Sequence, residues 1–174
     1  MKLFADRGYD RVTVEDIAGA VGVSHMTFFR HFPTKVSVLL DDPYDPIIGE
    51  MVAETDATLP AMERVRRGLL DAWSSIEEPE DEITRARFRT LTQHEDLIAH
   101  AWSNNRQTEQ VIVDALVSTG VPRLDARIAA GAVMGALMAA LVDWGEDEGS
   151  GPLGDRVRLA LQRLGGSAPE VRHA

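Results

Sequence analysis

Apolar residues recur along the chain with the 3.6-residue period of an α-helix, and no stretch sustains the alternation of a strand. Glycine and proline interrupt this period at helix-length intervals. We therefore expect an all-α protein. The predicted helices cover residues 1–7, 14–21, 25–31, 35–40, 47–55, 61–77, 80–93, 96–118, 125–144 and 153–164.

The clearest joint in this pattern is the segment 41–46, DDPYDP. Two prolines in four residues exclude helix there and stiffen the connection, which predicts a domain boundary. We expect a small domain over residues 1–41, called the head below, and a larger helical domain over residues 46–165, called the body. Residues 145–151 form a predicted glycine-rich acidic loop, and residues 166–174 a flexible tail.

Two short helices in the head are predicted to be joined by a tight turn. Apolar positions in residues 14–21 fall at i, i+3, i+4 and i+7 and give that helix one apolar face. Thr13 is placed to cap its N-terminus, with Asp16 three residues later. Gly22 ends the helix and Ser24 is placed to cap the next one. This is the pattern of a helix-turn-helix, in which the second helix enters the DNA major groove.

The second helix, residues 25–31, has distinct inner and outer faces. At about 100° per residue, Phe28 and Phe32 share the inner face. Met26, Thr27 and Arg30 then lie on the outer face, with Phe29 and His31 on its flanks. Taken alone, this pattern fits an ordinary amphipathic surface helix equally well.

Four runs of the head resemble the N-terminal domain of TetR-family transcriptional regulators: FADRGYD from Phe4, TVEDIA from Thr13, GVS from Gly22 and TFFRHFPTK from Thr27. The resemblance implies a recognition helix in the major groove and a phosphate contact from a lysine at the start of the following helix. It implies groove or base contacts from His25, Met26, Thr27 and Arg30, phosphate contacts from Thr13, His31 and Lys35, and a place for Phe29 in the same DNA-binding surface. Lys35 also stands at a predicted helix N-terminus, which favours an anion.

The head departs from the family pattern at two positions of the recognition helix. Phe29 occupies a position where the family commonly has a tyrosine that binds the DNA backbone, and phenylalanine has no hydroxyl to donate. Met26 occupies a position that is often glycine, which predicts an apolar contact, for example with a thymine methyl group. The family's first helix usually begins well upstream, so we also expect a native N-terminal segment before Met1 and a head core that this short helix leaves partly uncovered.

Charge is divided unevenly between the two predicted domains. The pI is about 4.9 and the net charge −10, yet residues 1–40 carry a net charge of +1. A near-neutral head can therefore meet DNA while the acidic body disfavours nonspecific binding to it. The chain has no cysteine, which leaves no disulfide or thiolate zinc site and fits a cytoplasmic protein. The longest apolar run, residues 128–142, is too short to span a bilayer.

The apolar run predicts a dimer interface. Gly131, Gly135 and Ala139 recur every four residues and permit close helix approach, while apolar residues around the whole helix require burial on every side. Without the resemblance, a core helix of a monomer fits equally well; with it, a four-helix homodimer interface is favoured. The predicted interface residues are Gly131, Gly135, Met138, Ala139, Val142, Val157 and Leu161.

Bulky apolar residues of the middle helices are mostly expected to be ordinary core. The resemblance implies that some of them line an apolar ligand cavity. The candidates are Met62, Trp73, Phe88, Leu91, Ile98 and Trp102.

Catalytic and metal-binding interpretations fail on spacing. His94 and His100 are six residues apart, about 240° around a helix, whereas a zinc helix needs a spacing of four, so both are predicted to be surface histidines. The acidic residues of segment 41–50 cannot form a calcium loop of the EF-hand type, because Pro43 and Pro46 occupy it and the glycine that the loop requires is missing from its place. Ser74 has no histidine near it in sequence. We therefore expect neither an enzyme nor a cofactor.

These features favour a homodimeric transcriptional regulator, in particular a repressor, that binds a palindromic double-stranded operator and responds to a small apolar effector without a membrane partner. The alternative is a helical protein-interaction domain or small enzyme domain in which the helix-turn-helix is only structural.

Overall fold

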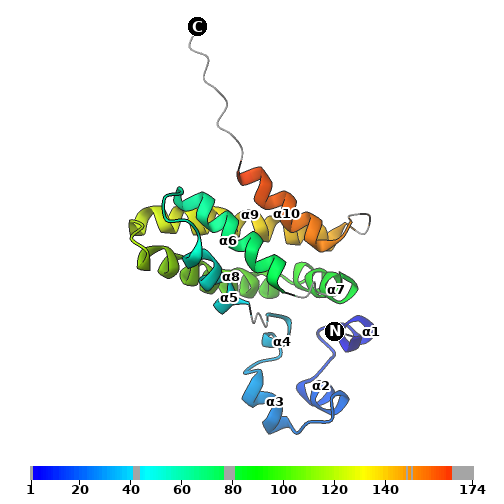
Figure 1. Ribbon diagram of the computed structural model, residues 1–174. Coiled ribbons are helices and arrows are strands. Elements are labelled where there is room, and N and C mark those ends of the chain that lie inside the picture. The colour runs from blue at the N-terminus through cyan, green and yellow to red at the C-terminus, as the bar shows by residue number, and fades with distance from the viewer. Residues whose placement is uncertain (1, 41–43, 77–80, 148, 150, 166–174) are drawn as a thin grey trace. The chain divides into compact units, whose positions relative to one another are not determined.

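The computed structural model describes residues 2–40, 44–76, 81–147, 149 and 151–165, and within them it contains ten helices and no strand (Figure 1). The predicted all-α class is confirmed, and every predicted helix is present. The predicted tail, residues 166–174, lies outside the described residues. The helices are α1 Lys2–Arg7, α2 Val14–Ala20, α3 His25–His31, α4 Ser37–Leu40, α5 Asp45–Glu54, α6 Ala61–Ser75, α7 Asp81–Thr92, α8 Glu95–Ser118, α9 Arg123–Glu146 and α10 Leu153–Leu164.

Helix α5 begins inside the segment that was predicted to exclude helix. It starts at Asp45 and carries Pro46 in its first turn. Proline is tolerated there because the first N–H groups of a helix have no acceptor within the helix, and its fixed φ suits the helix. The prediction that Pro46 lies outside a helix was therefore wrong, and residues 41–43 lie outside the described part of the chain.

Contacts divide the chain into two compact units. The first comprises residues 1–43, 79–107 and 142–150, and the second comprises residues 44–78, 108–141 and 151–174. Each unit combines segments that are distant in sequence, and α8 and α9 contribute to both. The domain limits at 41 and 46 therefore stay a prediction, since these units are not continuous along the chain.

Outside the head, the first unit is held together by the packing of α7 against the end of α9. Trp144 is fully buried, and the Arg85 guanidinium lies 3.9 Å from the centre of its ring. Arg85 also donates hydrogen bonds to the carbonyls of Trp144 and Asp147 at the C-terminus of α9. A Cβ atom added at Gly145 would lie 2.6 Å from Cβ of Phe88, so glycine is what allows α7 this close approach.

The second unit is built around the pair α5 and α6. A Cβ at Gly68 would lie 2.7 Å from Cα of Val52, so these helices touch through their backbones. Arg64 is buried, and its Nε donates to Oγ1 of Thr55 at 2.9 Å, beyond the C-terminal carbonyls of α5. This places a positive charge at the negative end of that helix.

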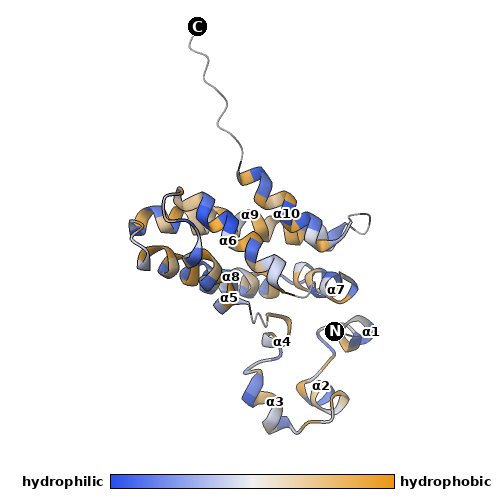
Figure 2. Ribbon diagram, in the orientation of Figure 1, coloured by the Kyte–Doolittle hydropathy of each residue, from blue (hydrophilic) through white to orange (hydrophobic). Residues whose placement is uncertain are grey.

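Helix α9 has one buried face and one uncovered face in the second unit. Its sequence is rich in apolar and small residues, and the apolar ones colour much of its visible ribbon orange (Figure 2). The buried face includes Ala126, Ala130 and Val133, whereas Leu124 is 69% and Ile128 57% exposed. By length and composition alone, α9 is the one helix in the described ranges that is apolar enough to cross a membrane. A helix that packs in a helix bundle also has a long apolar sequence and one buried face, as α9 does.

Candidate nucleic-acid interface

Local hydrogen bonds define both helices of the helix-turn-helix. The Asp16 amide donates to Oγ1 of Thr13 at 3.1 Å, and the Thr13 amide donates to Oδ2 of Asp16 at 2.9 Å, which confirms the predicted cap of α2. The bond from the Thr13 backbone also lowers the pKa of Asp16 below its usual value. Gly22 has a φ of +71° in the turn, a conformation that favours glycine. The Thr27 amide donates to Oγ of Ser24 at 3.1 Å and caps α3.

Helix α3 turns its inner face to the head and leaves its outer face open. Phe28 is buried and packs on Phe32, with ring centres 5.6 Å apart. Met26 is 81% and Phe29 39% exposed, and Arg30 is exposed as well. The predicted division into an inner and an outer face is therefore confirmed at these residues.

Thr27 and His25 differ from Met26 and Arg30, the exposed residues of the outer face, because each already has a partner in the head. Oγ1 of Thr27 lies 2.9 Å from Oγ of Ser24, and the residue is half-buried. Nε2 of His25 lies 3.1 Å from Oε1 of Glu15, and its ring meets the Phe29 ring edge-on with centres 4.6 Å apart. Glu15 was missed in the sequence because its contact crosses the turn and follows no helical period.

Lys35 is also bound inside the head. Its Nζ donates to the carbonyl oxygens of Tyr9 at 2.9 Å and Val12 at 3.1 Å, and lies 3.9 Å from the centre of the Tyr9 ring. Two of its three N–H donors are therefore in use, and one remains for a phosphate. Helix α4 begins at Ser37 and not at Lys35 as predicted, and the Ser37 amide is capped by Oγ1 of Thr34 at 3.2 Å.

Tyr9 connects this lysine to the start of α8 within the first unit. Its buried ring packs on Phe4 and on His94, with ring centres 5.3 and 5.5 Å away. Burial raises the pKa of the Tyr9 hydroxyl, and the carboxylates of Asp96 and Asp10 add to that rise. His94 is half-buried, so its assignment as a surface histidine was wrong, whereas the exposed His100 fits the prediction.

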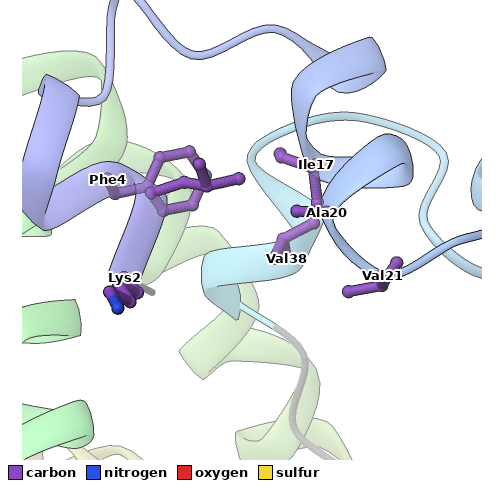
Figure 3. A pocket seen from close by; sticks show the side chains of 7 residues that line it. Lys2, Phe4, Ile17, Ala20, Val21 and Val38 are labelled. Atoms are coloured by element: carbon purple, nitrogen blue, oxygen red, sulfur yellow. The ribbon is translucent and has the colours of Figure 1, made fainter.

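A small apolar cavity of about 190 Å³ lies between α1, α2 and α4 (Figure 3). None of the predicted effector-pocket residues lines it. The lining residues are Lys2, Leu3, Phe4, Ile17, Ala20, Val21 and Val38.

The six residues predicted for an effector pocket are divided between the two units. Met62 and Trp73 lie on α6 in the second unit, and both are half-buried. The other four lie on α7 and α8 in the first unit, where Trp102 is 45% exposed. Of the other residues on α7 and α8, Phe88 and Leu91 are buried and Ile98 is half-buried. The effector cavity stays a prediction.

The residues predicted for a dimer interface fall into an open group and a buried group. A Cβ added at Gly131 or Gly135 would meet no atom within 4 Å. Ala139 is exposed and Val142 half-buried. Met138 is buried, as are Val157 and Leu161 on α10, which packs against α6 in the same chain. The interface also stays a prediction, and its open part lies on α9.

His, Asp and Glu side chains form no group of three or more that is suited to a metal ion within the described part of the chain.

Two protein-family models match this chain. The model described as bacterial regulatory proteins, tetR family, matches residues 1–41, and the model described as MftR C-terminal domain matches residues 59–169. The second match covers more than half of the chain. It coincides with much of the predicted body, and the first coincides with the predicted head.

Two curated relatives carry related names. The chain is 27% identical over 114 residues, 64% of its length, to a protein of Mycobacterium tuberculosis named as the mycofactocin biosynthesis transcriptional regulator MftR. It is 52% identical over 40 residues, 23% of its length, to the HTH-type transcriptional regulator TcmR of Streptomyces glaucescens. These alignments span 57% of the first relative and 18% of the second. The helix-turn-helix and the two family matches agree, and the chain belongs to the TetR family of bacterial regulatory proteins.

Proposed function

We propose that this chain is a cytoplasmic, non-enzymatic transcriptional regulator, and specifically a repressor, whose α3 enters the major groove of a DNA operator. The observation that carries the proposal is the open outer face of α3, where Met26 and Arg30 are exposed while Phe28 anchors the helix from inside. A helix held in this way presents side chains to base edges. The uneven charge supports the same function, because residues 1–40 carry a net charge of +1 while the chain as a whole carries −10.

The regulator acts as a homodimer through the uncovered face of α9. Leu124 and Ile128 are more than half exposed there, and Gly131 and Gly135 leave space for a closely packed helix. An apolar helix face of this kind supports burial against a second copy. A two-fold dimer presents two α3 helices to successive major grooves, so the operator is a near-palindrome with half-sites about one helical turn, or a multiple of it, apart.

A small apolar effector modulates DNA binding by favouring one state of the dimer over another. The proposal is supported by bulky apolar side chains of the body, including the half-buried Trp73 and the exposed Trp102. Binding near either indole changes the tryptophan fluorescence, and a ligand titration monitored in this way tests the proposal. An effector that releases DNA while contacting only residues of the head would show competition instead.

DNA binding is tested by titrating the purified chain against the DNA that flanks its own gene at several salt concentrations. Affinity falls steeply with salt if phosphates are neutralised, and a competitor of unrelated sequence binds more weakly. Arg30→Ala relaxes the sequence preference, whereas Arg106→Ala, which removes an exposed arginine of α8, leaves it unchanged. Equal affinity for all sequences by the unaltered chain would contradict the proposal.

A further inference from the structure

The most exposed large apolar side chain among the described residues is Met26, in the first turn of α3, at 81%. Its neighbours on the outer face are Phe29, three residues later, and Arg30, four residues later. The outer face of the recognition helix therefore combines an apolar end with a cation. A long, flexible thioether at this place requires an apolar partner if the surface is to be buried on DNA.

Neighbouring side chains leave Met26 as the free apolar contact of this face. The Phe29 ring is covered at one edge by His25, which is itself held by Glu15. Thr27 is turned towards Ser24. Phe28, in contrast, is buried in the head. DNA that approaches α3 therefore meets the whole side chain of Met26 first among its apolar groups.

We propose that Met26 recognises the C5-methyl group of a thymine in the major groove, an inference that rests on the proposed DNA-binding function. Base edges in that groove offer hydrogen-bond donors and acceptors, and the thymine methyl is their apolar group. A methionine pressed on a polar edge leaves base groups without partners, which disfavours guanine and cytosine at that position. Met26 thus selects an A·T pair by contact with its methyl group.

Arg30 fixes where this thymine lies relative to the base that the arginine recognises. Four residues of α-helix rise about 6 Å, while base pairs are about 3.4 Å apart along a strand. Arginine typically binds guanine through O6 and N7. Each half-site therefore contains a guanine within about two base pairs of the thymine that Met26 contacts.

The test removes the methyl group and nothing else. Binding sites are selected from a random duplex library with the full chain, and each thymine of a selected site is then replaced by deoxyuridine. At one position per half-site, the substitution weakens binding by the unaltered chain about fourfold, the factor for losing about 0.8 kcal/mol per buried methyl-sized group. Substitution in both half-sites weakens it about 15-fold.

Three variants assign this effect to its side chain. Met26→Ala binds the thymine and uracil sites equally well, and Met26→Leu keeps the discrimination because its side chain remains apolar. Val21→Ala is the matched control, since Val21 is also an exposed apolar residue of the head, at 66%, but lies at the end of α2. It keeps the full thymine preference. Because Met26 and Val21 are exposed, circular dichroism shows unchanged folding in all three.

The outcomes separate this inference from the proposed function. If a sequence is selected but no thymine-to-uracil change weakens binding, the methyl contact is wrong while DNA recognition stands. The same conclusion follows if Met26→Ala keeps the fourfold discrimination, because another residue then contacts the methyl. If no sequence is enriched and binding does not depend on salt, the proposed DNA-binding function itself fails.

Discussion

Gly135 on α9 offers the sharpest test of the dimer, because its substitution separates the interface from the fold of one chain. In a single chain, a Cβ at Gly135 meets no atom within 4 Å. Leucine also has a higher helix propensity than glycine, by up to about 1 kcal/mol. Gly135→Leu is therefore expected to leave the folded protomer intact. If this variant loses the dimer, the cause is then a clash with the second copy of the chain and not unfolding of the protomer.

The expected weakening follows from overpacking at a two-fold interface. Forcing extra carbon atoms into a packed contact typically costs about 1–3 kcal/mol. The residue occurs twice in a symmetric dimer, so the total is about 2–6 kcal/mol. The dissociation constant of the dimer rises by at least about 30-fold, since each 1.4 kcal/mol is a factor of about ten. Operator affinity falls with it, because both heads must be held together to bind a palindrome.

Gly68→Ala is the matched control, because an added Cβ atom at Gly68 clashes within a single chain. Its Cβ would lie 2.7 Å from Cα and 2.8 Å from N of Val52, both backbone atoms. Carbon atoms prefer contacts of about 3.5–4.0 Å, so α5 and α6 must separate by about 1 Å. Overpacking of about 1–3 kcal/mol exceeds the gain in helix propensity of about 1 kcal/mol. The net cost of up to about 2 kcal/mol lowers the melting temperature by up to about 8 °C.

Sedimentation velocity over a range of protein concentrations measures the dimer, and thermal unfolding measures the fold. Gly135→Leu should shift the protein to monomer while circular dichroism shows native helix content. Gly68→Ala should lower the melting temperature. The reasoning is refuted if the unaltered chain is a monomer at micromolar concentration, or if Gly135→Leu dimerises as tightly as the unaltered chain.

Three further changes test the electrostatics and caps of single sites. Lys35→Ala should weaken binding to every DNA sequence alike and lower the slope of the salt dependence by about one. It should also lower the melting temperature, because Nζ of Lys35 donates to two backbone carbonyls. An unchanged melting temperature would show that these two bonds contribute nothing to stability. Thr13→Ala should destabilise the head by about 1 kcal/mol in thermal unfolding, whereas Thr13→Ser, which keeps the capping oxygen, should not. Hydrogen bonds from Arg66 and then Arg67 lower the pKa of Glu63 to about 2. The stabilisation that these bonds give is complete above about pH 4.5 and is lost as the pH falls towards 2, so the difference in melting temperature between the unaltered chain and Glu63→Gln should shrink over that range.

The helices and caps of the head were predictable because their determinants are local. Thr13 and Asp16 are three residues apart, and Gly22 needs only its own backbone conformation to end α2. The 3.6-residue period also placed Phe28 on the inner face of α3, and the structure buries this side chain. The prediction that Pro46 lies outside a helix failed, because proline disfavours only helix interiors and Pro46 occupies the first turn of α5.

The side-chain partners of the candidate site were not predictable, because they join residues that no period relates. Lys35 binds the carbonyl of Tyr9, 26 residues away, and His94 packs on the same tyrosine from the position just before α8. A helical period places residues on a face but does not show which loop lies opposite that face. The assignment of His94 to the surface failed for this reason, and Glu15 was missed as the partner of His25 for the same one.

These partners divide the predicted DNA contacts into two classes. The Thr13 hydroxyl caps α2, and the Thr27 hydroxyl is hydrogen-bonded to Ser24, the cap of α3. His25 lies against Glu15, and Lys35 donates to two carbonyls. Such groups must share or give up an existing partner when DNA arrives, which reduces what each contributes to affinity. Met26 and Arg30, in contrast, are exposed on the outer face of α3. We therefore expect Met26 and Arg30 to account for most of the discrimination between DNA sequences, and the bound groups to fix the shape and position of the helix that carries them.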